Sequence, residues 1–263
     1  MAAKVLVITS GKGGVGKTTT TANLGTGLAK SGSKVVLIDA DIGLRNLDVV
    51  LGLENRIVYD IVDVVENNCR LEQAMIKDKR YSSLYLLPAA QTRDKTAVTP
   101  EQMANVCQEL KKDFDYVIID SPAGIEQGFK NAIAGADEAI VVTTPEVSAV
   151  RDADRIIGML EAEGVKNPTL IINRVRIDMI NKGDMIDIDD MIEILAVDLL
   201  GVVPEDEKIV VSTNKGEPVI LRDDAKAGEA FWNISRRVEG EKVPLISLED
   251  NFLDRLKRFV GLS

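Results

Sequence analysis

The chain of 263 residues carries 32 basic and 42 acidic side chains, a formal net charge of −10, and contains no histidine. This acidic balance argues against broad non-specific binding to nucleic acid, which needs clustered Lys and Arg, and the lack of histidine excludes His-dependent catalytic triads and His-ligated metal sites. Two cysteines are too few for a zinc site or a disulfide framework, whereas 45% hydrophobic residues suffice for one large core.

The N-terminal sequence has no secretory signal pattern, and no stretch reaches the roughly 20 apolar residues of a transmembrane helix. We therefore expect a cytoplasmic chain with reduced cysteines. Near its start, the stretch Gly-Lys-Gly-Gly-Val-Gly-Lys-Thr at 11–18 fits the pattern G-x-x-x-x-G-K-[ST] of a phosphate-binding loop. The apolar run 5–8 before it predicts a buried strand, and the segment 18–29 after it predicts a helix.

This strand, glycine turn and helix predict a nucleotide site. The glycines allow backbone N–H groups to converge on phosphate oxygens at the positive end of the helix. Lys17 is expected to reach the β- and γ-phosphates, and the Thr18 hydroxyl is expected to bind Mg²⁺. The nucleotide-contacting residues predicted around this loop are Gly11, Lys12, Gly13, Gly14, Val15, Gly16, Lys17, Thr18 and Thr19.

Two later apolar runs, 35–38 and 116–119, end in aspartate. The first leads into Asp39 and Asp41, and carboxylates at the carboxyl end of a parallel strand face the ligand crevice. The second leads into Asp120, where P-loop enzymes place a carboxylate of the Mg²⁺ shell. A single such aspartate could merely cap the next element, but in combination with the phosphate loop they indicate a nucleotide-hydrolysing site.

Alternating strands and helices complete the chain. Together they predict an α/β, three-layer P-loop NTPase fold, in which helices flank a mostly parallel, twisted sheet on both faces, over residues 1–240. Helices are predicted at 58–75, 100–112, 148–163, 189–195 and 225–238, and further strands at 84–88, 139–143, 169–172 and 199–203.

The second lysine of the loop, Lys12, narrows the family. A loop of this form resembles the deviant P-loop ATPases, which include partitioning ATPases, the nitrogenase iron protein and the MinD group. In that family the extra lysine reaches the nucleotide bound by the facing subunit, so the resemblance implies an ATP-dependent homodimer. The alternative is an ordinary solvated lysine in a surface loop.

Two segments resemble the switch regions of the MinD group: Asp41-Ile-Gly-Leu-Arg-Asn-Leu-Asp48 and Ser121-Pro-Ala-Gly-Ile125. The resemblance implies that Asp41 positions the attacking water and joins Lys12 and Lys17 as a catalytic residue, with Thr18 and Asp120 at the metal. The resemblance also implies that the nucleotide is ATP rather than GTP. By the same resemblance, the residues around the adenine are Asn173, Pro204, Glu205 and Asp206.

The helix predicted at 148–163 has a charged face. Spacing alone predicts that this face is solvated, whereas the resemblance implies part of the surface that binds a MinC-type division inhibitor and a MinE-type activator. The residues concerned are Arg151, Asp152, Asp154 and Arg155.

A linker is predicted at 241–250, followed by an amphipathic helix at 251–263. On a helix its apolar residues span an arc of roughly 120°, and from residue 252 onward its charges sum to +2. This pattern fits a membrane-surface helix on anionic lipid, or a terminal helix docked on the core. The resemblance favours the membrane, with the apolar contacts made by Phe252, Leu253, Leu256, Phe259 and Val260.

The resemblance covers essentially the whole chain. It implies an Mg²⁺-dependent ATPase, peripheral on the inner face of the cell membrane, which controls septum placement. One rival is the flagellar-number regulator ATPase, which usually has an extra segment before its first strand, whereas here that strand is expected to begin at Lys4. A second rival is a DNA-partitioning ATPase, which predicts basic patches and no amphipathic terminal helix.

Overall fold

A computed structural model describes residues 3–165 and 167–248. Eight strands form one sheet in the order β3-β4-β2-β5-β1-β6-β7-β8, and every neighbouring pair is parallel except β3 with β4. The strands are β1 (Lys4–Thr9), β2 (Val35–Asp39), β3 (Ile76–Lys77), β4 (Leu84–Leu87), β5 (Tyr116–Asp120), β6 (Glu138–Thr143), β7 (Thr169–Val175) and β8 (Asp198–Pro204).

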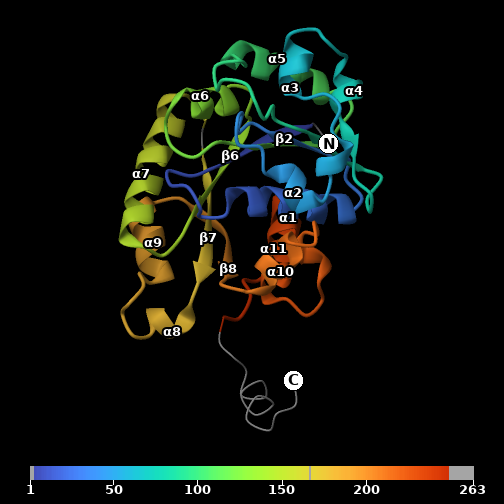
Figure 1. Cartoon of the computed structure of the whole chain (residues 1–263). Helices are drawn as coiled ribbons and strands as arrows, with labels where there is room; N and C mark the ends of the chain where they lie inside the picture. Colours follow the sequence, from blue (N-terminus) through green and yellow to red (C-terminus); the bar gives the residue numbers. More distant parts are fainter. Residues whose placement is uncertain (1–2, 166, 249–263) are drawn as a thin grey trace.

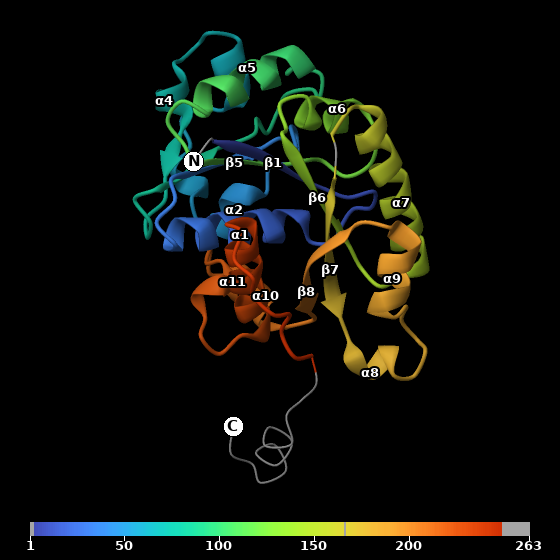
Figure 2. The same cartoon turned by 180° about the vertical axis from the view of Figure 1, so that it is seen from behind.

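Helices cover both faces of this sheet, which confirms the predicted three-layer architecture (Figures 1 and 2). On one face lie α1 (Lys17–Lys30), α2 (Leu47–Leu51), η1 (Glu54–Arg56), α10 (Lys208–Thr213), η2 (Val219–Leu221) and α11 (Lys226–Val238). On the other lie α3 (Ile61–Val65), α4 (Leu71–Ala74), α5 (Pro100–Leu110), α6 (Gln127–Ile133), α7 (Val147–Ala162), α8 (Ile177–Ile180) and α9 (Ile188–Leu195).

The central strands are apolar on both sides because both sides are buried. In β1, Val5 and Val7 belong to the core under α5 and α7, whereas Leu6 and Ile8 belong to the core under α1 and α11. Such double burial is the rule in parallel sheets, and it explains why the strand reads as an uninterrupted apolar run. Because β1, β2 and β5 are parallel neighbours, their carboxyl ends meet at one edge of the sheet. The polar residues that follow these strands are brought together there.

The single helix predicted at 58–75 is wrong, because the structure has two short helices there. Asp60 accepts hydrogen bonds from the backbone of Val62 and Asp63 and so begins α3 at residue 61. The chain leaves the helix at Asn67, whose φ of 60° is left-handed, a conformation that asparagine adopts more readily than most residues. The sequence pattern also does not predict the two-residue antiparallel strand β3, the helices α2, α6, α8 and α10, or the 3-10 turns η1 and η2.

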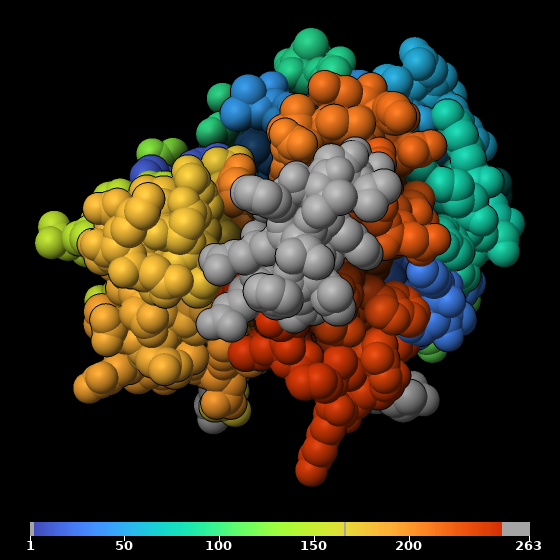
Figure 3. Space-filling view, turned by 90° about the horizontal axis from the view of Figure 1, so that it is seen from below, coloured from blue at the N-terminus to red at the C-terminus, as the bar shows by residue number. Residues whose placement is uncertain are grey.

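The face of the molecule seen from below carries the α8 region on one side, in yellow, and α10 and α11 on the other, in orange and red (Figure 3). The only tryptophan, Trp232, lies on α11 and packs against the core under α1 and α11, with the Lys30 ammonium 4.9 Å from its ring centre. No helix among the described residues is both long enough and apolar enough to cross a membrane. The predicted amphipathic helix at 251–263 lies outside the described residues.

Candidate nucleotide-binding and catalytic site

The phosphate loop joins β1 to α1, as its pattern predicts. Lys17 is the first residue of α1 and only 8% exposed; its Nζ donates to Ser10 Oγ at 3.0 Å. Ser10 Oγ in turn donates to the carbonyl of Lys12 at 2.8 Å. Burial lowers the pKa of Lys17, while the carboxylates of Asp120 and Asp41 oppose that shift. The ammonium is therefore held inside the loop, close to two negative charges.

Two glycines of the loop are required by close neighbours. A Cβ on Gly11 would lie 2.6 Å from the carbonyl carbon of Asp152, because α7 packs directly on the loop. Gly16 has a left-handed φ of 102°, and a Cβ there would overlap the side-chain amide of Asn173. The loop thus needs glycine both for its backbone turn and for its contacts with two other elements.

Two buried carboxylates face each other at the ends of β2 and β5. Asp39 and Asp120 are register partners, exposed by 1% and 2%. Burial and the charge of Asp39 raise the pKa of Asp120 to about 7, against hydrogen bonds from Thr18 and Thr21, the latter at 3.2 Å. Burial also raises the pKa of Asp39 to about 6. This excess of buried negative charge favours a bound cation.

The raised pKa of Asp120 predicts a pH-dependent metal affinity. At pH 6 the buried carboxyl is mostly protonated, and Mg²⁺ must displace that proton; at pH 8 it is ionised. With a pKa of about 7, the apparent affinity for Mg²⁺ in the presence of ADP should be about tenfold higher at pH 8 than at pH 6.

Titration of Mg²⁺ against the thermal unfolding midpoint at fixed ADP measures this difference, after correction for Mg²⁺ bound to free ADP. ADP without Mg²⁺ is the control at each pH. Equal corrected affinities at the two pH values would contradict the assignment of Asp120 to the metal shell.

The first switch segment is anchored by Asp39. Its carboxylate accepts backbone N–H bonds from Asp41 at 3.0 Å and from Asn46 and Leu47, each at 3.1 Å. These bonds fix the start of α2 to the end of β2. Asp41 itself is half-buried; burial raises its pKa, and the charges of Lys95 and Lys17 oppose the shift. Asp41 thus lines the same pocket as the residues of the phosphate loop.

A pocket of about 500 Å³ opens at this edge of the sheet. The phosphate loop, both switch segments, β7 and α10 contribute to it, and it is lined among others by Gly14, Gly16, Lys17, Thr18, Thr19, Asp41, Asn46, Ser121, Ala123, Arg174 and Thr213. No group of three acidic or cysteine side chains within the described residues could hold a metal alone. The donors fit Mg²⁺ that is shared between a carboxylate, a hydroxyl and phosphate oxygens, with water completing the shell.

The predicted adenine residues lie at the ends of β7 and β8. Asn173 is buried; its amide donates to the carbonyl of Val15 at 2.7 Å, and its oxygen accepts from the N–H of Arg174. Pro204 ends β8, and Asp206 accepts backbone N–H bonds from Lys208 and Ala227. Glu205 lies 4.0 Å from the Arg174 guanidinium. These contacts place Asn173 against the phosphate loop, and its contact with adenine stays a prediction.

The second lysine of the loop lies at the surface. Lys12 is 41% exposed, and its Nζ contacts Glu146 Oε2 at 3.0 Å and Ser148 Oγ at 3.2 Å, at the start of α7. Its ammonium is therefore available to a second molecule once it leaves Glu146.

Further along α7, the predicted partner residues Arg151, Asp154 and Arg155 are exposed, whereas Asp152 is half-buried beside the loop.

Several residues of the site are not named in the sequence analysis. Ser10 and Thr21 hold Lys17 and Asp120, and Arg174 and Thr213 line the pocket. Position in the motif marks Ser10, which directly precedes the loop, and Thr21, one helical turn after Lys17. Arg174 and Thr213 reach the site through tertiary packing of β7 and α10, and the sequence pattern does not encode that.

Known proteins share this architecture. Residues 6–219 match the family described as the CobQ/CobB/MinD/ParA nucleotide binding domain. In sequence, the chain is 59% identical to the septum site-determining protein MinD of Bacillus subtilis (strain 168), over 98% of each chain. It is 52% identical to the protein of that name from Helicobacter pylori (strain ATCC 700392 / 26695), over 93% of this chain and 94% of the relative.

Solved structures agree. The MinD chain of a MinC:MinD cell division protein complex from Aquifex aeolicus is 50% identical, with a TM-score of 0.87 over 93% of this chain and 99% of that chain. MinD from Pyrococcus horikoshii OT3, complexed with Mg-ADP, is 31% identical, with a TM-score of 0.83 over 90% of this chain and 96% of that chain. The chain belongs to the MinD/ParA family of P-loop ATPases, and within it to the septum site-determining MinD proteins.

Proposed function

We propose that this ATPase is a nucleotide-timed membrane switch in division-site placement, active as a dimer with one ATP and one Mg²⁺ in each subunit. The observation that carries the proposal is the position of the Lys12 side chain, which lies at the surface rather than in the lining of the pocket and whose ammonium contacts Glu146 and Ser148 at the start of α7. From this position, Lys12 is better placed to contact the phosphates bound by a second subunit than those bound by its own subunit.

The residues of the pocket fit a magnesium nucleotide, the ligand in the related Pyrococcus structure. When ATP and Mg²⁺ are bound, ATP supplies the phosphoryl group, and Mg²⁺ would neutralise part of the negative charge of the phosphates. Lys17 offers an ammonium to the phosphates, and Asp120 and Thr18 offer oxygens to the metal. These residues lie on the buried helix α1 and the central strand β5. The chain therefore contributes to hydrolysis by positioning the reacting groups and by electrostatic stabilisation.

Hydrolysis then depends on Asp41, which lines the pocket, and on Lys12 of the facing subunit. Asp41 orients water, since the residue lines the pocket and its backbone N–H is held by the Asp39 carboxylate. Lys12 of the facing subunit stabilises the negative charge that develops on the transferred group. To do so it must exchange Glu146 for phosphate, so dimer formation and the release of this ion pair are one event.

The segment 251–263 supplies the membrane contact in this proposal. One short amphipathic helix binds lipid weakly, whereas two on one dimer bind much more tightly because the second contact is intramolecular. ATP therefore favours the dimer and the membrane together, and hydrolysis releases both. The ligand is the anionic lipid of the inner membrane, which attracts the basic face of the helix.

The exposed charged face of α7 is the proposed docking surface for protein partners. Its residues Arg151, Asp154 and Arg155 project from the helix whose first turn holds Lys12. The related Aquifex structure contains MinC and MinD together, and a MinC-type division inhibitor is accordingly one proposed partner. A MinE-type activator of hydrolysis, or a polar anchor in its place, is the other.

Light scattering of the intact chain tests the dimer. With ATP and Mg²⁺ at micromolar protein, the mass should double, and with ADP and Mg²⁺ it should return to that of the monomer. A monomer in both nucleotides, or a dimer of equal stability in both, would contradict the proposal.

A further inference from the structure

Arg80 joins three segments outside every motif of the nucleotide site. It lies in the turn between β3 and β4, and its guanidinium donates to the carbonyl of Leu51 at 2.7 Å and to the carbonyl of Gly216 at 2.9 Å. It also pairs with the carboxylate of Asp78 at 3.0 Å. Because a guanidinium is planar with five fixed donors, it can satisfy all three acceptors at once.

The two carbonyls lie beside two helices, α2 and α10, that each form a wall of the nucleotide pocket. Leu51 ends α2, which lines the pocket with Val49 and Val50, and Gly216 follows α10, which lines it with Thr213. Beyond the pocket these walls meet through Gly52 and Gly216.

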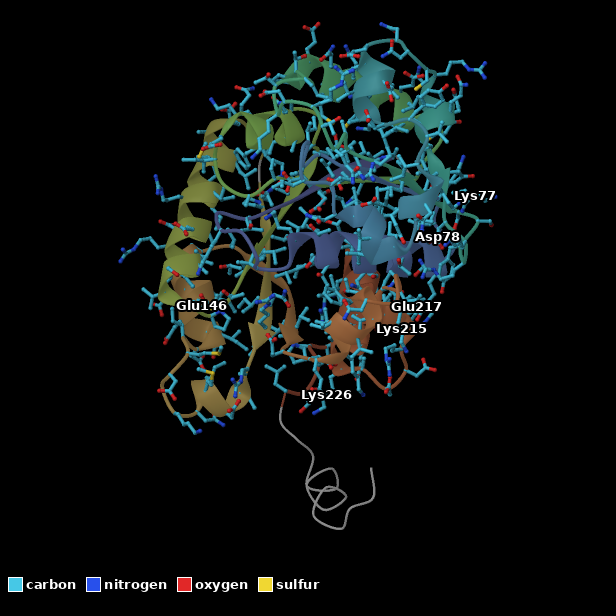
Figure 4. The ribbon with its side chains drawn as sticks, in the orientation of Figure 1. Lys77, Asp78, Glu146, Lys215, Glu217 and Lys226 are labelled. Carbon is cyan, nitrogen blue, oxygen red and sulfur yellow. The ribbon has the colours of Figure 1, made fainter. Side chains whose placement is uncertain are left out.

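The contact between these two glycines is tight. A Cβ on Gly52 would lie 2.8 Å from the carbonyl oxygen of Gly216, and both residues have left-handed φ angles of 66° and 65°. Lys79 reinforces the junction by donating to the carbonyl of Gly52 at 2.8 Å. The labelled residues Asp78, Lys215 and Glu217 show this junction on the far side of the molecule from Glu146 (Figure 4).

Asp78 holds the guanidinium in place. It is 1% exposed as a side chain and accepts the backbone N–H groups of Arg80 at 2.7 Å and Tyr81 at 3.0 Å. Burial would raise its pKa, but the hydrogen bonds from Arg80 and Tyr81 outweigh burial and keep the pKa below its usual range. The arginine therefore faces a fixed, ionised partner rather than a mobile surface charge.

The helix α2 is tied at both ends. At its start Asp39 accepts the N–H groups of Asn46 and Leu47, and at its end Arg80 binds the carbonyl of Leu51. We propose that Arg80 is a positioning residue for ATP hydrolysis, which fixes the first switch segment, and with it Asp41, against the α10 wall of the pocket. This inference rests on the role proposed for Asp41. Lys17 and Thr18 lie on α1 and Asp120 on β5, and none of these three Arg80 contacts runs to either element, so we expect ATP binding to be kept without Arg80.

A double-mutant cycle on the full chain tests this proposal. Arg80→Ala should lower kcat about tenfold, because a small misplacement of Asp41 is costly, and should change KM for ATP less than threefold. In the Asp41→Ala background the same change should lower kcat less than twofold, since no positioned carboxylate remains to be displaced. Equal losses in both backgrounds, or no loss in the intact chain, would overturn the proposal.

Arg56→Ala is the matched control. Arg56 also donates to a carbonyl, that of Lys77 at 2.8 Å, but it does not bridge the two walls, so kcat should stay within twofold. If the Asp41→Ala variant hydrolyses ATP at the normal rate, the role proposed for Asp41 is wrong. Amide hydrogen exchange then tests separately whether Arg80 fixes the first switch segment. Exchange should rise at 46–51 and 214–217 in Arg80→Ala, and also in Arg80→Lys, which keeps the Asp78 pair but cannot span both carbonyls. Unchanged exchange in both variants would overturn the proposal.

Discussion

Lys12→Ala should lower the rate of ATP hydrolysis by about a thousandfold while ATP affinity changes about threefold at most. In P-loop enzymes, a cation supplied from a second molecule is worth about 10³ or more in kcat because it meets charge that develops only in the transition state. Ground-state binding suffers little, since the Lys12 ammonium lies at the surface, 3.0 Å from Glu146, while Lys17 remains inside the loop. Steady-state phosphate release and equilibrium binding of ATP measure the two quantities.

A matched lysine variant separates this effect from general loss of charge. Lys4→Ala removes another half-exposed lysine, whose partner Glu138 lies 2.9 Å away, remote from the pocket. Surface pairs of this kind contribute about 1 kcal/mol or less, so turnover should be unchanged. Normal turnover of Lys12→Ala would remove the role in the facing subunit assigned to this residue.

Leu256→Glu should weaken ATP-dependent binding to anionic vesicles by about a hundredfold or more. A leucine buried among acyl chains contributes about 1.5–3 kcal/mol, and the proposed dimer would present it twice. Co-sedimentation with vesicles containing an anionic phospholipid, at increasing lipid, gives the affinity. Hydrolysis in solution without vesicles is the check that the ATPase domain is intact.

Asp254→Ser is the matched control for the membrane segment. In the predicted helix, Asp254 falls outside the apolar arc that contains Leu256. Removing its negative charge should leave vesicle binding as strong as that of the intact chain, or slightly stronger. Equal binding by the intact chain and Leu256→Glu would show that this face does not enter the lipid.

The sequence predicts where the phosphate loop and the strand-end aspartates lie in the fold because these residues belong to local motifs. Glycine spacing places the phosphate loop, and apolar runs that end in aspartate place Asp39 and Asp120 at neighbouring strand ends, where the structure pairs them. The regular period of buried strands and helices predicts the three layers for the same reason. Motifs of this kind are short-range, so a linear reading recovers them.

Long-range contacts are not recovered in this way. The Lys12 contact with Glu146 spans 134 residues, and the Arg80 contact with Gly216 spans 136. Neither pairing has a periodic pattern, since both arise where turns from distant elements meet. The broken helix between 58 and 75 was missed for a different reason, because the apolar spacing continues across Asn67 although its backbone turns.

The proposed function joins two parts of the chain, a loop assigned to the nucleotide and the segment 251–263 assigned to lipid. Vesicle sedimentation in ATP and in ADP, with the intact chain and with a chain ended before Asn251, tests that connection most directly. We predict that only the intact chain in ATP sediments with anionic vesicles and that it is released as ATP is hydrolysed. Equal sedimentation in both nucleotides, or binding by the shortened chain, would contradict it.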